Sequence, residues 1–359
     1  MKLKKYIFTS LFIALISCNH EQENTISDLH FSKDKITLFK ESTLFKNKKI
    51  IPLEINEDVL IGKSPSLLLD DGFFIYSKSG GGQVIHFDES GEFKNTIGTI
   101  GGGPKEYIEL TDINLNQKEK SIDVLALNSI CSYTYDGDFI KKQNIEYPAS
   151  SFYQDPDKNL WLYTGNNKAY SDYKLFKIDS SSKEKKFLKI SSDLLPISEN
   201  NFHKAGELVS FHESFNNDIY LITNGVLKKA HTISFRNLNI DLDKAPKDPM
   251  EFIQYINQTH YATARCYLEN KNYIYIQVFE GIPQDKYGKF YHWFINKQTN
   301  KNTIIEQPYN IAPDSYLYAP QILTANNDLY FLGYVLESED EVSNSEENPS
   351  VVSINLSGL

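Results

Sequence analysis

The residues Asn216-Asn217-Asp218-Ile219-Tyr220-Leu221 contain the pattern that decides the fold: a polar turn, then three residues that mix aromatic, β-branched and Leu side chains. The pattern occurs six times, with its apolar triplets at 73–75, 122–124, 160–162, 219–221, 274–276 and 329–331. Successive triplets begin 49, 38, 59, 55 and 55 residues apart. Periods of this length indicate one supersecondary unit per repeat.

A second alternating strand follows each triplet, and further turns rich in Asp, Asn, Gly and Ser separate the strands. Short strands at regular spacing predict an all-β array. Four antiparallel strands per repeat, arranged radially, give a six-bladed β-propeller. We expect blades near residues 66–100, 108–147, 149–192, 207–240, 260–306 and 314–359, within a single domain that spans 36–359.

The last blade lacks room for an outer strand, because the chain ends at Leu359 soon after the strand at 351–356. The alternating segment at 48–55, Lys-Lys-Ile-Ile-Pro-Leu-Glu-Ile, precedes the first blade and has no partner of its own. We predict that it completes the last blade and leaves no long sheet edge exposed. Pro52 suits an outer edge strand, where its missing N–H faces solvent. The alternative is a free N-terminal strand.

The first 17 residues have the pattern of a signal peptide, with Lys2, Lys4 and Lys5 before an apolar run at 7–16. The following Leu15-Ile16-Ser17-Cys18 resembles the lipobox of bacterial lipoproteins, which implies cleavage before Cys18 and lipid attachment to it. An ordinary secretory signal is the alternative. Residues 18–35 are polar and unpatterned, and we expect a flexible tether. The expected location is the cell envelope, with a lipid anchor in the outer membrane. The sequence is consistent with a position on either the periplasmic or the surface side of that membrane.

The segment Asp88-Glu89-Ser90-Gly91-Glu92-Phe93, followed by the Gly-rich stretch from Ile97 to Tyr107, resembles the six-bladed β-propeller lipoproteins of Bacteroidota. These are relatives of the NHL-repeat propellers, and the turn from Asp155 to Leu162 is similar to an NHL turn, with Lys158 where Gly is usual. The likeness covers about residues 45–359. It implies the fold and an envelope location, but no shared reaction.

Charge and cysteine content limit the partners. The net charge is −10, and Arg236 and Arg265 are the only arginines. An acidic chain without a basic stripe would repel a phosphate backbone, so we expect no nucleic-acid binding. After Cys18, only Cys131 and Cys266 remain, in units two and five across the ring. We expect both to be free and buried.

Three motifs suggest ligands but have simpler interpretations. The Gly-rich stretch 98–105 lacks the Gly-Lys-Ser/Thr of a phosphate loop, and an inter-blade crossing explains it better. Residues 155–159 begin like a calcium loop, yet Leu160 replaces the required Gly, so a hairpin turn is favoured over calcium binding. The eight histidines show no zinc spacing, and we assign no metal site or cofactor.

Two insertions interrupt the repeat and are the candidate binding regions, because long loops on a rigid scaffold often carry function. The insertion at 241–264 contains Pro249 at the start of a predicted helix over 250–257, whose apolar face is 252, 253 and 256. The other spans 280–290. Their aromatic residues are the candidate ligand contacts: Tyr255, Tyr261, Tyr287 and Phe290. Both insertions are equally consistent with capping a blade interface. The acidic run 337–347 is expected to be a solvated loop.

No catalytic motif is identifiable, and the sequence favours a lipid-anchored module that binds a glycan, a peptide or an envelope protein at one end of the ring. The alternative is a hydrolase or lyase that acts on carbohydrate or lactone, with acidic or histidine residues converging from several blades. Three or more such side chains together on the axis would favour the enzyme. An axis lined by Tyr, Asn, Ser and Lys would favour binding.

Overall fold

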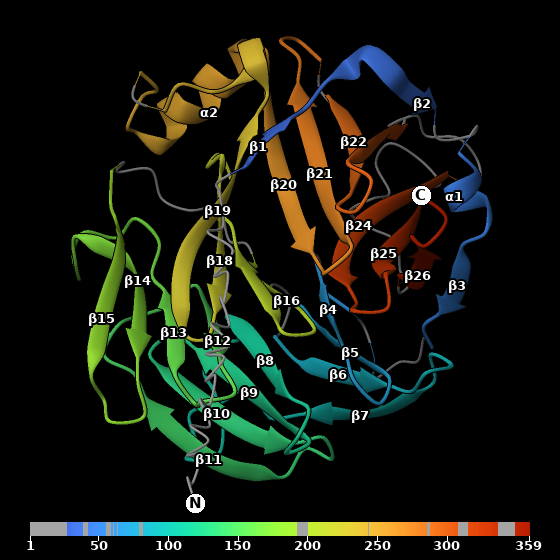
Figure 1. The fold of residues 1–359 in the computed structure, drawn as a ribbon. Helices are drawn as coiled ribbons and strands as arrows, with labels where there is room; N and C mark the ends of the chain where they lie inside the picture. Colours follow the sequence, from blue (N-terminus) through green and yellow to red (C-terminus); the bar gives the residue numbers. More distant parts are fainter. Residues whose placement is uncertain are drawn as a thin grey trace, which may run out of the picture.

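The computed structural model describes residues 27–38, 42–54, 59, 61–62, 64–78, 82–191, 200–242, 244–285, 288–307, 315–336 and 349–359. They form six blades of four antiparallel strands, two of which gain a fifth, parallel strand at the outer edge. The sheets surround one axis, and the first strand of each sheet lies innermost (Figure 1). The predicted all-β, six-bladed propeller is therefore confirmed.

The first three blades follow the chain from the axis outward. Their strands are β4 (Ser66–Leu69), β5 (Phe73–Tyr76), β6 (Val84–Phe87) and β7 (Phe93–Ile97); β8 (Asp112–Asn116), β9 (Ser121–Ala126), β10 (Ser129–Thr134) and β11 (Phe139–Asn144); and β12 (Ser151–Gln154), β13 (Leu160–Tyr163), β14 (Tyr173–Ile178) and β15 (Glu184–Lys189).

The last three blades have the same order but recruit strands from the N-terminal segment. Their strands are β16 (Phe202–Ala205), β17 (Leu208–Phe211), β18 (Asp218–Thr223), β19 (Val226–Ser234) and β1 (Ser27–His30); β20 (Tyr261–Glu269), β21 (Tyr273–Gly281), β22 (Lys289–Asn296), β23 (Lys301–Gln307) and β2 (Ile36–Leu38); and β24 (Ser315–Leu323), β25 (Asp328–Leu336), β26 (Ser350–Asn355) and β3 (Lys49–Pro52).

Side chains within the repeated turns hold each hairpin in place. In blade three, the Asp155 carboxylate accepts hydrogen bonds from the backbone and side-chain nitrogens of Asn159 and, at 3.4 Å, from the indole of Trp161. In blade five, Asn270 Oδ1 accepts from two backbone N–H groups at 2.8 Å. Such local bonds explain why Asp and Asn recur at these positions. The 155–159 loop is a hairpin turn, as we expected.

The closing strand is also confirmed. Strand β3 pairs antiparallel with β26, with Ile51 opposite Val351 and Pro52 opposite Ser350. Just beyond it, the Glu54 N–H donates to Gly91 O in blade one. Gly91 has a φ of +91°, and an added Cβ would lie 2.1 Å from Pro52 O. Only glycine allows the two ends of the ring to approach this closely.

The tether expected over residues 18–35 is wrong for residues 27–35. Strand β1 pairs in parallel with β19, the 3-10 turn η1 (Lys33–Lys35) follows, and β2 pairs in parallel with β23. Between β1 and η1, Phe31 is buried, and its ring contacts Tyr291 and Trp293 edge to face. This polar segment therefore folds because blades four and five supply open edges and an aromatic groove. Cys18 lies outside the described residues.

The Gly-rich stretch crosses from blade one to blade two, as expected. Tyr107 is fully buried at the junction, and its hydroxyl donates to Gly82 O at 3.0 Å. Glu106 Oε2 accepts from the Gly103 N–H at 2.7 Å, so a carboxylate of the same stretch binds this backbone N–H of the glycine turn. Cys131 and Cys266 are both free and buried, as predicted.

The insertion at 241–264 carries α2 (Pro249–Gln258), whose first turn is capped by Asp248. Of the expected apolar face, Phe252 is buried but Ile253 is exposed. Of the 280–290 insertion, residues 280–281 end β21 and residues 289–290 begin β22. The acidic run 337–347 lies outside the described residues. Among the residues that are described, no helix is both long and apolar enough to cross a bilayer.

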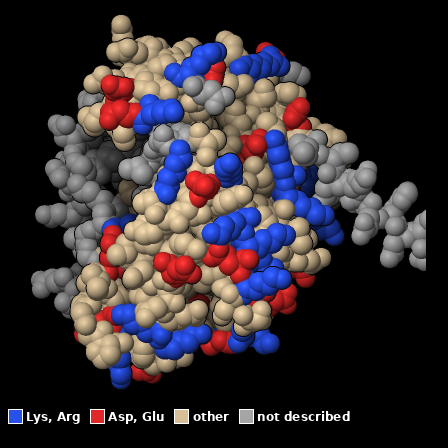
Figure 2. Space-filling view, turned by 90° about the vertical axis from the view of Figure 1, so that its left-hand side faces the viewer, with Lys and Arg blue, Asp and Glu red and all other residues tan. Residues whose placement is uncertain are grey.

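Lys and acidic side chains alternate over the face that includes the outer strands of blade three (Figure 2). Neither sign of charge forms a continuous stripe there, so this face offers no electrostatic track for a charged polymer.

Candidate functional site: a cavity on the propeller axis

A cavity of about 350 Å³ lies on the axis, enclosed by the inner strands β4, β8, β12, β16 and β24 and by the end of β20. Alternate side chains of a strand point to opposite faces, so each inner strand presents only a few side chains to this space. The volume is at the lower end of the range found for small-molecule sites. Every blade contributes to the wall.

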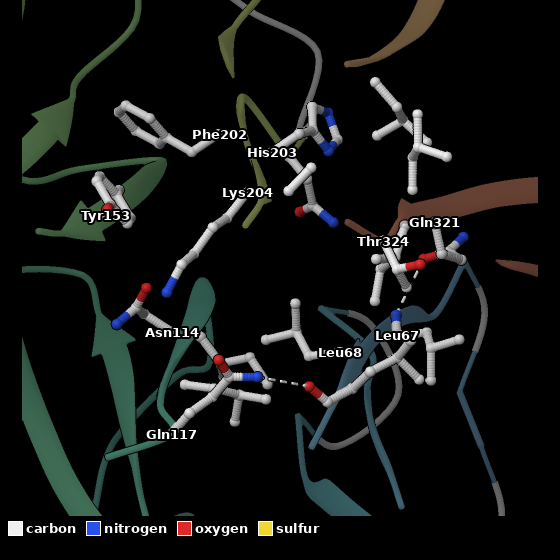
Figure 3. Close-up of a pocket in the computed structure, with 18 of the residues that line it drawn as sticks. Leu67, Leu68, Asn114, Gln117, Tyr153, Phe202, His203, Lys204, Gln321 and Thr324 are labelled. Carbon is white, nitrogen blue, oxygen red and sulfur yellow. Dashed lines mark hydrogen bonds between the residues drawn. The ribbon is translucent and has the colours of Figure 1, made fainter. Parts of the chain in front are cut away.

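Amide side chains join neighbouring inner strands along the wall (Figure 3). Gln321 Oε1 on β24 accepts from the Leu67 N–H of β4 at 2.9 Å, and Gln117 Nε2 donates to Leu69 O at 3.3 Å. These bonds satisfy backbone groups that the innermost strands would otherwise leave without a partner. The amides therefore hold the wall in shape.

Asp112 connects three blades at the cavity wall. Its Oδ1 accepts from the Tyr76 hydroxyl of blade one at 2.7 Å and from the Ile113 N–H at 3.0 Å. Its Oδ2 accepts from the Phe152 N–H of blade three at 3.0 Å. Burial raises the pKa of this carboxyl, although Lys78 and the three donors act in the opposite direction. Asp112 is thus a structural hub with little capacity for another ligand.

Two titratable groups next to each other on β16 differ in their environment. Burial, with the neighbouring His212 imidazole, lowers the pKa of His203 to about 4, so this ring is neutral at pH 7. Lys204 is exposed to solvent and extends from β16 into the cavity toward Asn114 of β8 (Figure 3). Within the described part of the chain, no acidic group forms an ion pair with Lys204.

Glu269, at the end of β20, is the other acid on the wall, and its charge is compensated. It is buried, accepts from the Tyr267 hydroxyl at 2.7 Å and contacts Lys297 Nζ at 2.5 Å. Burial alone would raise its pKa, but the hydrogen bond from His231 and the charge of Lys297 hold the pKa at about 2. Glu269 is therefore a paired carboxylate at pH 7.

The residues that line this cavity do not form a metal-binding cluster. Over the described ranges, no three His, Cys, Asp or Glu side chains gather so as to hold an ion. The wall combines Tyr, Asn, Gln, Thr and Lys with Asp112, His203, Glu269 and apolar side chains. It therefore has the Tyr, Asn and Lys expected of a binding axis, together with three residues of the types expected of an enzyme.

The aromatic candidates from the sequence lie elsewhere. Tyr255 of α2, Tyr261 of β20 and Phe290 of β22 belong to one aromatic cluster, whose remaining rings are Phe215, Phe252 and Phe279. The cluster packs the 241–264 insertion against blades four and five, and none of its rings lines the cavity. Tyr287 lies outside the described residues.

Sequence reasoning missed the cavity residues, although one signal was present. Asn114 lies on β8, the innermost strand of its blade, which immediately precedes a repeat turn. Lys204 also lies on an innermost strand, β16, but the repeat turn of blade four comes one strand later, between β17 and β18. A polar residue that alternates with apolar ones on an innermost strand is a candidate for the axis.

Comparisons with known proteins give a family and a fold. No curated protein matches the chain in sequence. A solved structure of a Bacteroides fragilis protein described as exported superposes with a TM-score of 0.70 at 17% identity, covering 92% of this chain and 99% of that one. At this identity the likeness shows the fold alone.

Two other solved structures have a TM-score of 0.40, too low to carry an argument. One is a protein of unknown function from Bacteroides caccae, at 9% identity over 81% of this chain and 90% of that one. The other is the WD40 domain of Pan2 from Neurospora crassa, at 8% identity over 80% of this chain and 88% of that one.

Residues 25–357 match the family described as a domain of unknown function, DUF4934. Because the match spans nearly the whole propeller, the chain belongs to the DUF4934 family.

Proposed function

We propose that this protein is a lipid-anchored module of the cell envelope that binds a ligand in its axial cavity. The observation that carries the proposal is the cavity itself: about 350 Å³, walled by all six blades, with hydrogen-bonding groups left unused. Polar groups that face one concave space and have no protein partner are available to fix the orientation of a ligand there. Glycans and peptides supply matching donors and acceptors.

Asn114 and Tyr153 carry this argument. The Asn114 amide is half-buried, the Tyr153 ring is almost fully buried, and both lie on the cavity wall. Neither side chain makes a hydrogen bond to a described residue, and neither polar group is among the buried atoms that lack a partner, so both are accessible from the cavity. By contrast, the polar groups of Asp112, Gln117 and Gln321 are engaged.

A screen of glycans and short peptides by thermal shift should identify a ligand that raises the Tm. A ligand at 100 times its Kd stabilises the folded state by about 2.7 kcal/mol. We expect Asn114→Leu to remove the shift, because it deletes an unused amide within the cavity. The matched control is Tyr255→Leu, which alters the aromatic cluster outside the cavity.

Loss of binding in Tyr255→Leu, with binding kept in Asn114→Leu, would move the site to the aromatic cluster and refute the cavity assignment. Conversion of any bound carbohydrate or lactone to a product would show that the protein is a hydrolase or lyase. Product formation should therefore be followed in the same samples by mass spectrometry.

The envelope location is supported by the lipobox-like Leu15 to Cys18 and by the exported description of the Bacteroides fragilis relative. Two or more acyl chains hold a protein on a membrane, since each buried CH₂ contributes about 0.8 kcal/mol. We expect the native protein to partition into Triton X-114 and Cys18→Ser to remain in the aqueous phase. Detergent partitioning of Cys18→Ser would exclude an anchor at this residue. Protease treatment of intact cells distinguishes a surface position from a periplasmic one.

A further inference from the structure

We infer that the axial cavity selects a small carboxylated, hydroxyl-rich ligand, the chemistry of a uronic acid, and that Lys204 binds its carboxylate. The inference rests on the proposed function and specifies its ligand class. It is argued from the balance of charge inside the cavity and from the positions of three unused polar groups.

Both acids on the wall are already engaged. Asp112 has three hydrogen-bond donors, and Glu269 has Lys297, His231 and Tyr267. His203 is neutral at pH 7, because its pKa is about 4. Lys204 is the wall's other charged group, and it forms no ion pair with a described residue. Because the oxygens of Asp112 and Glu269 are already occupied, Lys204 is the charged group available to bind an anion, even though the chain as a whole has a net charge of −10.

Hydrogen-bonding groups surround this cation. Lys204 extends toward Asn114, whose amide has both a donor and an acceptor to offer (Figure 3). The Tyr153 hydroxyl is a third group without a hydrogen-bond partner among the described residues, and it lies on the adjacent β12. A ligand that brings hydroxyls next to its carboxylate would satisfy all three groups. A purely apolar acid would leave the amide and the phenol unpaired, at a cost in affinity.

The wall also has an apolar surface, formed by two tilted aromatic rings. The rings of Tyr153 and Phe202 lie 6.2 Å apart with an interplanar angle of 33°, on neighbouring inner strands. One face of a sugar ring is apolar and packs well against such surfaces, while its hydroxyls reach the polar groups. A volume of about 350 Å³ suits one or two sugar rings rather than a polymer.

Isothermal titration of the full-length protein with glucuronate, galacturonate, glucose and inorganic phosphate tests the inference. We expect binding of a uronate, and at least tenfold weaker binding of glucose and of phosphate. Lys204→Met should weaken uronate binding at least tenfold. Lys228→Met is the matched control, because it removes the same charge from exposed β19 outside the cavity and should bind normally. Equal melting temperatures of the two variants exclude a folding defect.

The outcomes separate this inference from the proposed function. Uronate binding that survives in Lys204→Met, or glucose binding as tight as that of the uronates, overturns the ligand class but leaves a cavity that binds sugars. Phosphate binding as tight as uronate binding would reduce the site to a general anion site and also overturn it. If no uronate binds, the ligand class is wrong, and the broader screen with Asn114→Leu decides whether the cavity binds anything.

Discussion

Ile51→Asp is expected to open the propeller ring and to lower the free energy of unfolding by at least about 4 kcal/mol. Ile51 is 9% exposed and packs with Leu332, Val351 and blade-one side chains where β3 completes the last blade. The change forfeits about 2 kcal/mol of apolar burial and places an unpaired carboxylate in a closed interface. Domains of this kind have only about 5–15 kcal/mol of stability in total. Urea unfolding followed by Trp fluorescence measures the loss.

The adjacent residue provides the control. Ile50 lies on the same strand and is 38% exposed, so Ile50→Asp introduces the same charge on the outer face of the blade. We expect it to change stability by less than about 1 kcal/mol. If the two variants unfold at the same urea concentration, β3 does not close the ring in solution.

The scaffold could be predicted from the sequence because the interactions that determine its turns are local. The Asp155 turn is held by hydrogen bonds from Asn159 and Trp161 to the Asp155 carboxylate. Because such bonds form within one turn, similar polar residues recur in the turns of the other blades. The closing strand could be predicted by counting strands, because the sixth blade has three strands of its own and lacks the outer one. Neither conclusion required knowledge of a distant contact.

The N-terminal strap and the cavity depend on distant partners, and this is why sequence reasoning missed them. Ser27 pairs with His231, which is 204 residues away. The polar sequence around Ser27 does not indicate that β19 has an open edge. Lys204 and Asn114 face the same cavity only because their strands are both innermost. Aromatic residues in long loops proved ambiguous, because Tyr261 and Phe290 stabilise the attachment of an insertion rather than facing the cavity.

We expect Asp112→Ala to lower the free energy of unfolding by about 3 kcal/mol and to loosen the cavity wall. Asp112 is buried and holds donors from three blades, so its removal leaves the Phe152 N–H and the Tyr76 hydroxyl without this acceptor. Each buried group that loses its partner costs about 1–3 kcal/mol.

Asp112→Asn keeps the shape of the side chain but replaces one acceptor oxygen with a donor, so it should recover only part of the lost stability. The exposed Asp157 of blade three gives the matched control, and Asp157→Asn should differ from the native protein by less than about 0.5 kcal/mol. If Asp112→Asn were as stable as Asp157→Asn in urea, the three blades would not depend on this carboxylate. The cavity wall would then owe its shape to apolar packing alone.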